Sequence, residues 1–244
     1  MSVFVIQGDA LEQAKLFGRK QFDLIYIDPP FNTKDVQKLG ENSYNDKHGN
    51  FESFLCPILK QLSEVLTDDG SLFVHLDYRE VHYAKVWLDG IMGRAAFQGE
   101  IVWHFETGGL SKSRWTNKHN TILWYCKAKE PYFDFAAVPE QPRKAPKAGY
   151  EGAKKWSSVW NINVSTTDPE RAGYPSQKPE ELLGTLVRVH TRPGALCLDV
   201  FAGSGTLGAV CEQLGRHAVL VDSNPQAIEV TRRRLPQAEV QVPE

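Results

Sequence analysis

The hydrophobic pattern of the chain alternates between short apolar runs and longer stretches in which apolar residues recur every three or four positions. The short runs predict β-strands, and they lie at residues 3–6, 22–27, 71–76, 97–105, 120–126, 195–200 and 217–221. The periodic stretches predict amphipathic helices, and they lie at residues 10–18, 51–66, 79–92, 178–190, 206–214 and 225–234. This alternation predicts an α/β fold, with a doubly wound, mostly parallel sheet that carries helices on both faces.

Two segments interrupt the alternation. Residues 32–50 are polar and predict a mobile loop, and residues 106–176 are rich in Gly, Ser, Lys, Arg, Trp and Pro and predict an insertion. Two local signals also concern boundaries. Pro57 predicts a kink or a late start in the helix expected over 51–66, and the dipeptide at 69–70, Asp-Gly, predicts a turn before the next strand.

Composition narrows the class of protein. With 244 residues, 41% of them hydrophobic and 24% charged, the chain corresponds to one sizeable domain with a core and is not globally disordered. A net charge of −2 is unlike that of a small basic DNA-coating protein, although one basic face remains compatible with it. No apolar run approaches the roughly 18 residues of a membrane span, and no secretory signal is evident. We therefore expect a cytoplasmic protein with no membrane association.

Cysteine and histidine spacing predicts no metal site. The four cysteines form no C-x-x-C pair, and each lies in an apolar run, which predicts buried free thiols. They are Cys56, Cys126, Cys197 and Cys211. The seven histidines show no ligand spacing, and we interpret them as structural or DNA-facing. No Ser-His-Asp or Cys-His nucleophile arrangement is evident either.

The tetrapeptide Asp28-Pro29-Pro30-Phe31 follows directly on the buried-looking strand at 22–27. A carboxylate and a carbonyl whose direction is fixed by proline can accept the two hydrogens of a planar exocyclic amine. An aromatic ring beside them can stack on the base that carries the amine. Read alone, the same residues are also compatible with a turn that ends a strand.

A second signature lies at 195–222, where a strand, a Gly203-Ser204-Gly205 turn, a helix and a further strand end at Asp222. Glycine allows the backbone to approach a ligand closely, and a carboxylate at the tip of the next strand can bind ribose hydroxyls. Asp222 follows Gly203 by 19 residues, close to the spacing of a nucleotide-binding βαβ unit. This signature alone leaves a dinucleotide, an adenosyl group and a simple tight turn open.

Taken in this order, the two signatures resemble the β group of amino DNA methyltransferases, which use S-adenosylmethionine. Three further segments share the resemblance, at residues 8–11, 76–80 and 174–179. It implies a circularly permuted, Rossmann-like methyltransferase sheet in which the catalytic half comes first and the cofactor glycine loop last. The implied parts are a catalytic half at 1–105, a target-recognition insertion with one or more sheet strands at 106–176, and a cofactor-binding half at 177–244.

The resemblance also implies which residues contact S-adenosylmethionine. They are Asp9, Ala10, Asp28, Gln177, Lys178, Phe201, Ala202, Gly203, Ser204, Gly205, Thr206 and Asp222. Asp9 would contact the adenine and Asp222 the ribose, while Gln177 and Lys178 would open a helix and hold the methionine carboxylate, an anion that suits a helix N-terminus. Simpler alternatives are that Asp9 caps a helix, that Lys178 is solvated, and that Asp222 caps the helix expected from residue 225.

Within this family, the catalytic group would comprise Asp28, Pro29, Pro30 and Phe31. An exocyclic amine is a poor nucleophile because its lone pair is delocalised into the ring, so acceptors that favour a tetrahedral nitrogen stabilise the transition state. An aspartate at the first position resembles adenine-N6 enzymes, and cytosine-N4 remains open. Cytosine-C5 chemistry is disfavoured, because residues 56–57 are Cys-Pro and the Pro-Cys order that it needs is absent.

DNA contacts are expected from basic residues interleaved with aromatic ones. The candidates with a family counterpart or a basic, aromatic context are Tyr44, Lys112, Arg114, Trp115 and Lys118. A second such group comprises Arg143, Lys144, Lys147, Lys154, Lys155 and Trp156. The alternative is a solvated surface insertion. We further expect the segment 32–50 to close over a base flipped out of the duplex.

The sequence therefore predicts a DNA methyltransferase that transfers a methyl group from S-adenosylmethionine to adenine N6 in double-stranded DNA. Alternatives are a cytosine-N4 enzyme on the same fold, a non-catalytic subunit that binds the cofactor and presents nucleic acid, and an enzyme that acts on RNA or on a small molecule. The resemblance adds a homodimer and, as in restriction-modification systems, a cognate restriction endonuclease as expected partners.

Overall fold

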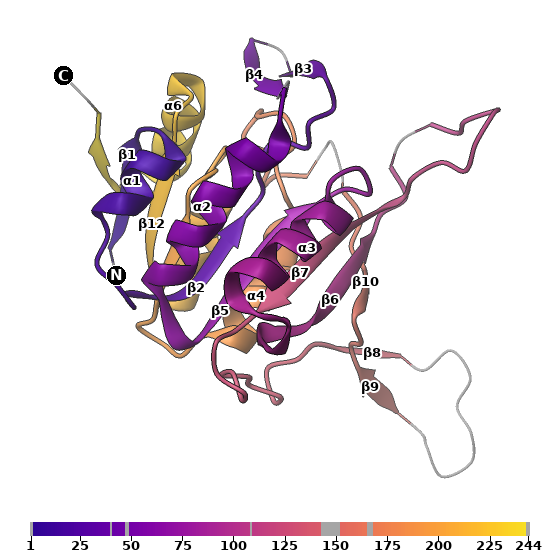
Figure 1. Ribbon diagram of the computed structural model, residues 1–244. Coiled ribbons are helices and arrows are strands. Elements are labelled where there is room, and N and C mark those ends of the chain that lie inside the picture. Colours follow the sequence, from indigo (N-terminus) through magenta and orange to yellow (C-terminus); the bar gives the residue numbers. More distant parts are fainter. Residues whose placement is uncertain are drawn as a thin grey trace.

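A computed structural model describes residues 2–39, 41–46, 49–107, 109–142, 152–164 and 168–242. Within that part of the chain, the main sheet has nine strands in the order β10-β6-β7-β5-β2-β11-β12-β1-β13 (Figure 1). The strands are β1 (Val3–Gln7), β2 (Phe22–Ile27), β5 (Leu66–Leu76), β6 (Phe97–His104), β7 (His119–Tyr125), β10 (Val159–Asn161), β11 (Leu196–Asp199), β12 (His217–Asp222) and β13 (Glu239–Gln241). Strand β7 runs antiparallel to both β5 and β6, and the other neighbouring pairs are parallel.

Helices cover both faces of the sheet, as the sequence predicts. They are α1 (Ala10–Leu16), α2 (Phe51–Val65), α3 (Val81–Met92), α4 (Glu180–His190), α5 (Thr206–Leu214) and α6 (Pro225–Arg234), with a short 3₁₀ turn at Arg94–Ala96. Alternate residues of β2 point into two separate cores. Ile25 and Ile27 pack with α1, α2 and α3, whereas Leu24 and Tyr26 pack with α4 and α5. In Figure 1 the first group of helices lies in front of the sheet.

Helix α2 runs through its proline. It begins at Phe51, where the Asn50 side chain accepts a hydrogen bond from Ser53 N at 3.0 Å. A late start at Pro57 is therefore wrong, and the cap explains why, because it satisfies the first turn before the proline is reached. The apolar face expected from the periodicity is buried.

The polar segment 32–50 contains a hairpin where the sequence predicts only a loop. Strands β3 (Asp35–Leu39) and β4 (Asn42–Asp46) pair antiparallel outside the main sheet. Because neither strand faces the core, their sequence lacks the apolar alternation that would have revealed them. Asp46 fastens the base of the hairpin: its side chain accepts from Asn32 N at 2.7 Å, and its carbonyl accepts from Lys34 N at 3.0 Å.

The Asp-Gly dipeptide at 69–70 lies inside strand β5 and forms no turn. A Cβ at Gly70 would lie 2.8 Å from the carbonyl oxygen of Asp23, so this glycine permits a close approach of two backbones beside the irregular pairing of β2 with β5. The sequence predicts no strand after the helix at 225–234, but the chain after α6 forms β13, which pairs with β1.

The segment 106–176 contributes two strands to the main sheet, β7 between β5 and β6 and β10 at the edge. It also holds β8 (Glu140–Pro142) and β9 (Ala153–Lys155), which form a small separate hairpin. Three cysteines are buried as expected, whereas Cys56 is half-buried. No helix in the described ranges is long and apolar enough to cross a membrane.

The parallel strands all end on one side of the sheet, which we call the carboxyl edge, and the other side is the amino edge. Loops that follow β1, β2, β5, β6, β11 and β12 therefore leave from the carboxyl edge. In open α/β sheets, ligands bind at this edge. The topology thus brings Asp28, the turn at 203–205 and Asp222 to the same side of the molecule, although they lie far apart in sequence.

Candidate active site

A cavity of about 600 Å³ opens at the carboxyl edge. Every residue that the sequence nominates for catalysis or cofactor contact lines it, except Gly205. The nominated residues in its wall are Asp9, Ala10, Asp28, Pro29, Pro30, Phe31, Gln177, Lys178, Phe201, Ala202, Gly203, Ser204, Thr206 and Asp222. The two signatures therefore share one cavity.

The glycine loop takes a conformation that requires its glycines. Gly203 has φ 52° and Gly205 has φ 74°, both in the left-handed region. A Cβ at Gly205 would lie 2.7 Å from Thr231 Cγ2, so this glycine lets the loop pack against α6 rather than face the cavity. The Thr231 hydroxyl donates to the carbonyl of Gly203 at 3.0 Å.

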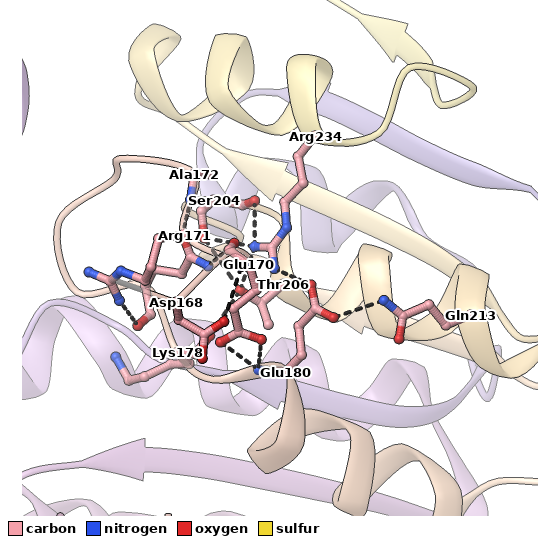
Figure 2. A network of polar contacts seen from close by, with 11 residues as sticks. Asp168, Glu170, Arg171, Ala172, Lys178, Glu180, Ser204, Thr206, Gln213 and Arg234 are labelled. Carbon is pink, nitrogen blue, oxygen red and sulfur yellow. Dashed lines mark hydrogen bonds and ion pairs between the residues drawn. The ribbon is translucent and has the colours of Figure 1, made fainter. Parts of the chain in front are cut away.

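Arg234 ties the end of the glycine loop to two helices (Figure 2). Its guanidinium donates to Thr206 Oγ1 at 3.0 Å and forms an ion pair with Glu180 at the start of α4. The Glu180 carboxylate in turn accepts from Gln213 of α5 at 2.8 Å. This network joins α4, α5 and α6 and fixes the end of the loop.

Asp222 holds the glycine loop at the tip of β12. Its carboxylate accepts from Gly203 N and from Asn224 N, both at 2.8 Å. Burial raises the pKa of Asp222, and these two backbone hydrogen bonds oppose the rise. The cap of α6 is Asn224, whose side chain accepts from Gln226 N. The alternative that Asp222 caps this helix is therefore wrong, and its contact with ribose stays a prediction.

Asp9 does cap a helix, as the simpler alternative predicts. Its Oδ1 accepts from Leu11 N at 2.9 Å and from Glu12 N at 3.1 Å at the start of α1. The same side chain lines the cavity beside Ala10. Capping fixes the direction of the carboxylate and leaves a contact with adenine as a prediction.

The two carboxylate oxygens of Asp28 have different surroundings. Oδ2 accepts a hydrogen bond from Lys178 Nζ. Oδ1 is buried, has no hydrogen-bond partner among the described residues, and lies 3.8 Å from His75 Nδ1. Burial raises the pKa of Asp28, and the charge of Lys178 pulls it back down. Asp28 is thus a carboxylate with one oxygen left over for a ligand.

Lys178 is buried, so the alternative of a solvated lysine is wrong. Its side chain is 10% exposed, and besides Asp28 it donates to the Ser176 carbonyl at 3.1 Å. Its Nζ also lies 5.4 Å from the centre of the Phe31 ring, within range of a cation–π interaction.

Gln177 has a structural role in this cavity wall. Its amide nitrogen donates to the Glu170 carbonyl at 2.7 Å, and its amide oxygen accepts from Ala172 N at 2.8 Å. Helix α4 begins at Glu180, so Gln177 and Lys178 precede it and do not open it. The Glu180 N–H already binds the Glu170 carboxylate, at 3.1 and 3.3 Å (Figure 2). The chain thus supplies an anion of its own to this N–H, and the contact of Gln177 and Lys178 with the methionine carboxylate stays a prediction.

Sequence reasoning missed three buried polar residues around the site. The hydroxyl of Tyr26 lies 2.7 Å from His75 Nδ1, and burial lowers the pKa of His75 well below its usual value. Asp199 lines the cavity, accepts from Phe201 N at 2.8 Å, and has a pKa raised well above its usual value by burial. The position of Asp199 at the end of a strand was a usable signal, whereas the two aromatic residues lie in apolar runs that look purely structural.

The first basic segment forms an arm that leaves the carboxyl edge between β6 and β7 (Figure 1). Lys112, Arg114 and Trp115 are exposed on it, and Trp115 is 99% exposed. Lys118 lies at its base, where it donates to the carbonyls of Glu106 and of residue 107 at 3.0 and 2.8 Å. The backbone of Tyr44 lies in β4, and its side chain is outside the description.

The second basic segment lies elsewhere. Arg143, Lys144 and Lys147 fall outside the described residues. Lys154 and Lys155 lie on β9, which precedes β10 and therefore sits toward the amino edge (Figure 1). Lys155 is committed to Glu140 at 3.2 Å and to two backbone carbonyls. Among the described residues, the basic side chains of the two segments thus do not form one surface.

Comparison with known proteins bears on this geometry. The model of the DNA methylase family matches residues 22–233. The chain is 29% identical to the type II methyltransferase M.HpaI of Haemophilus parainfluenzae, over 95% of this chain and 73% of that protein. It is 28% identical to the DNA adenine methyltransferase YhdJ of Escherichia coli K12, over 95% and 82% of the two chains.

Solved structures agree on the fold. The PvuII cytosine-N4-specific DNA methyltransferase superposes with a TM-score of 0.73 at 20% identity, over 99% of this chain and 95% of that one. The M1.HpyAVI–SAM complex superposes with a TM-score of 0.68 at 21% identity, over 96% and 98%. With a family model that covers most of its length and a cavity shared by both signatures, the chain belongs to the DNA methylase family of N6-adenine and N4-cytosine methyltransferases, whose methyl donor is S-adenosylmethionine.

Proposed function

We propose that this protein transfers a methyl group from S-adenosylmethionine to adenine N6 of a base flipped out of double-stranded DNA. The observation that carries the proposal is the unpaired Oδ1 of Asp28, buried in the cavity that the glycine loop also lines. A buried acceptor without a partner is costly unless a ligand satisfies it. An amine hydrogen of the target base is such a ligand.

The residues present fit the cofactor. The cavity volume of about 600 Å³ lies in the range of small-molecule sites. A Cβ at Gly203 would lie 3.3 Å from the Tyr174 ring, so a glycine at this position avoids crowding between the loop and that ring. When bound, S-adenosylmethionine supplies an electrophilic methyl group on its sulfonium. We assign the cofactor-facing wall to the residues of 201–206, Asp9 and Asp222.

Asp28 and the carbonyl of Pro29 would act on the target amine together. Each accepts one amine hydrogen, which favours a tetrahedral nitrogen whose lone pair is available for attack. Methyl transfer would leave S-adenosylhomocysteine and a cationic amine nitrogen, and Asp28 would accept the proton that this nitrogen sheds. Phe31 stacks on the base and offsets part of the cost of flipping it, by about 1–3 kcal/mol.

The choice of adenine rests on the aspartate at the first position of the tetrapeptide and on the likeness to a relative named as a DNA adenine methyltransferase. Cytosine N4 is the second candidate, since both amines present the same two hydrogens. The solved structure named as cytosine-N4-specific is 20% identical, which supports the fold alone. A non-catalytic subunit is the weaker reading, because it has no need of a buried, unpaired carboxylate oxygen.

We propose that double-stranded DNA approaches the carboxyl edge, with the exposed Lys112, Arg114 and Trp115 of the arm in contact with it. The arm leaves the sheet at the same edge at which the cavity opens, which supports one continuous interface with DNA. Basic side chains there would bind phosphates and make affinity depend on salt. Residues 1–105, 106–176 and 177–244 would then supply catalysis, recognition and cofactor binding respectively.

The test is nucleoside mass spectrometry of unmethylated duplex DNA incubated with the protein and S-adenosylmethionine. N6-methyladenine supports the proposal, and N4-methylcytosine replaces adenine with the second candidate. Asp28→Ala should abolish the product while S-adenosylhomocysteine still binds. Turnover that survives in Asp28→Ala would remove the catalytic assignment.

A further inference from the structure

The charged residues that line the cavity are unequal in sign. Among the described lining residues there are four aspartates and one lysine. The aspartates are Asp9, Asp28, Asp199 and Asp222, and the cation is Lys178. S-adenosylmethionine carries a carboxylate of its own. Such a group is repelled by an acidic wall unless it reaches a cation, and Lys178 is the cation that this wall offers.

Lys178 is already committed when the cavity holds no ligand. Its Nζ donates to Asp28 Oδ2 and to the carbonyl of Ser176. The other three aspartates rely on backbone N–H groups instead, at Leu11, Phe201 and Gly203 among others. Among the described lining carboxylates, Asp28 is therefore the one hydrogen-bonded to Lys178, and it is also the carboxylate of the proposed chemistry.

The position of Lys178 allows it to change partner. It lies in the loop before α4, two residues ahead of the helix, on a flexible four-carbon stem. The loop residues from Tyr174 to Lys178 all line the cavity. A rotation of the side chain alone would carry its Nζ from Asp28 toward a ligand in the same space.

We propose that Lys178 is a cation shared between two anions, held by Asp28 in the free protein and by the carboxylate of the cofactor in the complex. Asp28 would then meet the target amine free of its ion pair with Lys178 only after the cofactor has bound. For the role of Asp28 this rests on the proposed function, whereas the exchange of Lys178 is a binding property that stands without it. The exchange makes cofactor binding the first step and target capture the second.

The exchange would also help Asp28 to accept the proton that the reaction releases. While Lys178 is paired with Asp28, it holds the pKa of that carboxyl down. Once Lys178 has moved, Asp28 is a more basic carboxylate in the same buried place. It is then better able to accept the proton that the methylated nitrogen loses, so charge is neutralised within the site.

Calorimetry with two ligands tests the exchange. S-adenosylhomocysteine carries the carboxylate, and 5′-methylthioadenosine shares its adenosyl thioether but lacks the whole amino-acid end, both the carboxylate and the ammonium. Asp28→Asn removes the competing charge with little change of shape. We expect it to tighten S-adenosylhomocysteine about tenfold, within the usual range of coupling between sites, and to leave methylthioadenosine unchanged. Lys178→Gln should weaken S-adenosylhomocysteine and leave methylthioadenosine unchanged.

The double variant separates the exchange from simple repulsion between Asp28 and the ligand. If Lys178 mediates the effect, Asp28→Asn gives no gain in the Lys178→Gln background. A tenfold gain that persists there overturns the proposal, as does the same gain for both ligands or no gain in Asp28→Asn. If Lys178→Gln fails to fold, Lys178→Met replaces it in the cycle. Failure of the proposed function would appear separately, as DNA without methylated nucleosides while this coupling remains.

Discussion

Two opposing effects act on the pKa of Asp28. Burial favours the neutral form and raises the pKa, whereas Lys178 favours the charged form and lowers it. Because the ionised carboxylate is the active species, methylation should fall as pH drops through the pKa of Asp28. Lys178→Gln removes the group that lowers this pKa in the cofactor-free protein, so the acid limb of the kcat/KM profile for S-adenosylmethionine should move to higher pH. The measurement is the pH dependence of methyl transfer to duplex DNA.

A matched control for that profile is Lys129→Gln, which removes an exposed lysine on the loop after β7 at the amino edge. Its acid limb should coincide with that of the wild type. An acid limb that stays in place in Lys178→Gln would mean that a group other than Asp28 controls the profile.

The Asp222 side chain stabilises the glycine loop, and this contribution can be measured. Its carboxylate accepts two backbone N–H groups, one of them from the glycine loop. Hydrogen bonds to a charged group contribute about 1.5–3 kcal/mol, so Asp222→Ala should weaken S-adenosylhomocysteine binding at least about tenfold and lower the melting temperature. Glu212→Ala, at an exposed acid of α5, is the control and should do neither. An unchanged dissociation constant in Asp222→Ala would remove this residue from the cofactor site.

At the scale of elements, the β3–β4 hairpin is fastened to the start of α6. Gln226 accepts from Ser43 N at 2.8 Å and donates to the Glu41 carbonyl at 3.1 Å, while Asn224 donates to the Ser43 carbonyl at 2.7 Å. Val36 and Ser43 of the hairpin line the cavity. The segment that the sequence predicts to close over a flipped base is thus joined to the side of the site that carries the glycine loop.

Gln226→Ala should loosen the hairpin without unfolding the molecule, because it removes both of its hydrogen bonds to the hairpin. We expect faster hydrogen exchange and earlier proteolysis at residues 35–46, with the exchange of α2 and β5 unchanged. Gln237→Ala, at an exposed glutamine beyond α6, should leave the hairpin as it is. Equal protection in both variants would show that Asn224 or packing holds the hairpin instead.

The elements differ in how far the sequence predicts them, and packing against the core explains the difference. Helix α5 and helix α6 have the predicted bounds because each buries an apolar stripe between clear end signals. The β3–β4 hairpin was missed because neither face meets the core, so its strands lack an apolar period. The glycine at 70 was misread because a turn and a close backbone approach use the same residue type.

Site residues follow the same rule. The cavity wall was predictable where a strand end or a glycine turn fixes the backbone, as at Asp28 and Asp222. The partners of side chains were not, because they depend on contacts between distant segments. Two contacts are of this kind. Lys178 binds Asp28, which lies 150 positions away in the sequence, and the Glu170 carboxylate accepts from the first N–H of α4, at Glu180. Local sequence contains no sign of either contact.

At the scale of the whole molecule, two buried histidines make folding sensitive to acid. Burial lowers the pKa of His190 from 6.5 to about 3 and that of His75 well below 6.5. The unfolded chain therefore binds these protons at a higher pH than the folded protein does. As pH falls below about 6, each histidine lowers the free energy of unfolding by about 1.4 kcal/mol per pH unit, down to its folded pKa.

The check is urea unfolding at several pH values between 7 and 4 for the wild type and His190→Gln. The glutamine cannot be protonated, so the free energy of unfolding should fall less steeply with decreasing pH, and the difference in slope should equal the contribution of one histidine. His190 packs among Phe73, Trp124 and Phe133, so the variant will also be less stable at pH 7, and the slope is the quantity to compare. Parallel slopes would assign the acid sensitivity to other groups.

The separation of the two sheet edges has a practical consequence for handling the protein. The loop after β7 lies at the amino edge, anchored by Ala128 N on the Asp68 carbonyl at 2.8 Å, and Lys129 is exposed on it. Three of the four native cysteines are buried. A cysteine introduced by Lys129→Cys would therefore be a nearly selective anchor for a fluorophore or a solid support, and a molecule tethered there would present its reactive edge to the surrounding solution.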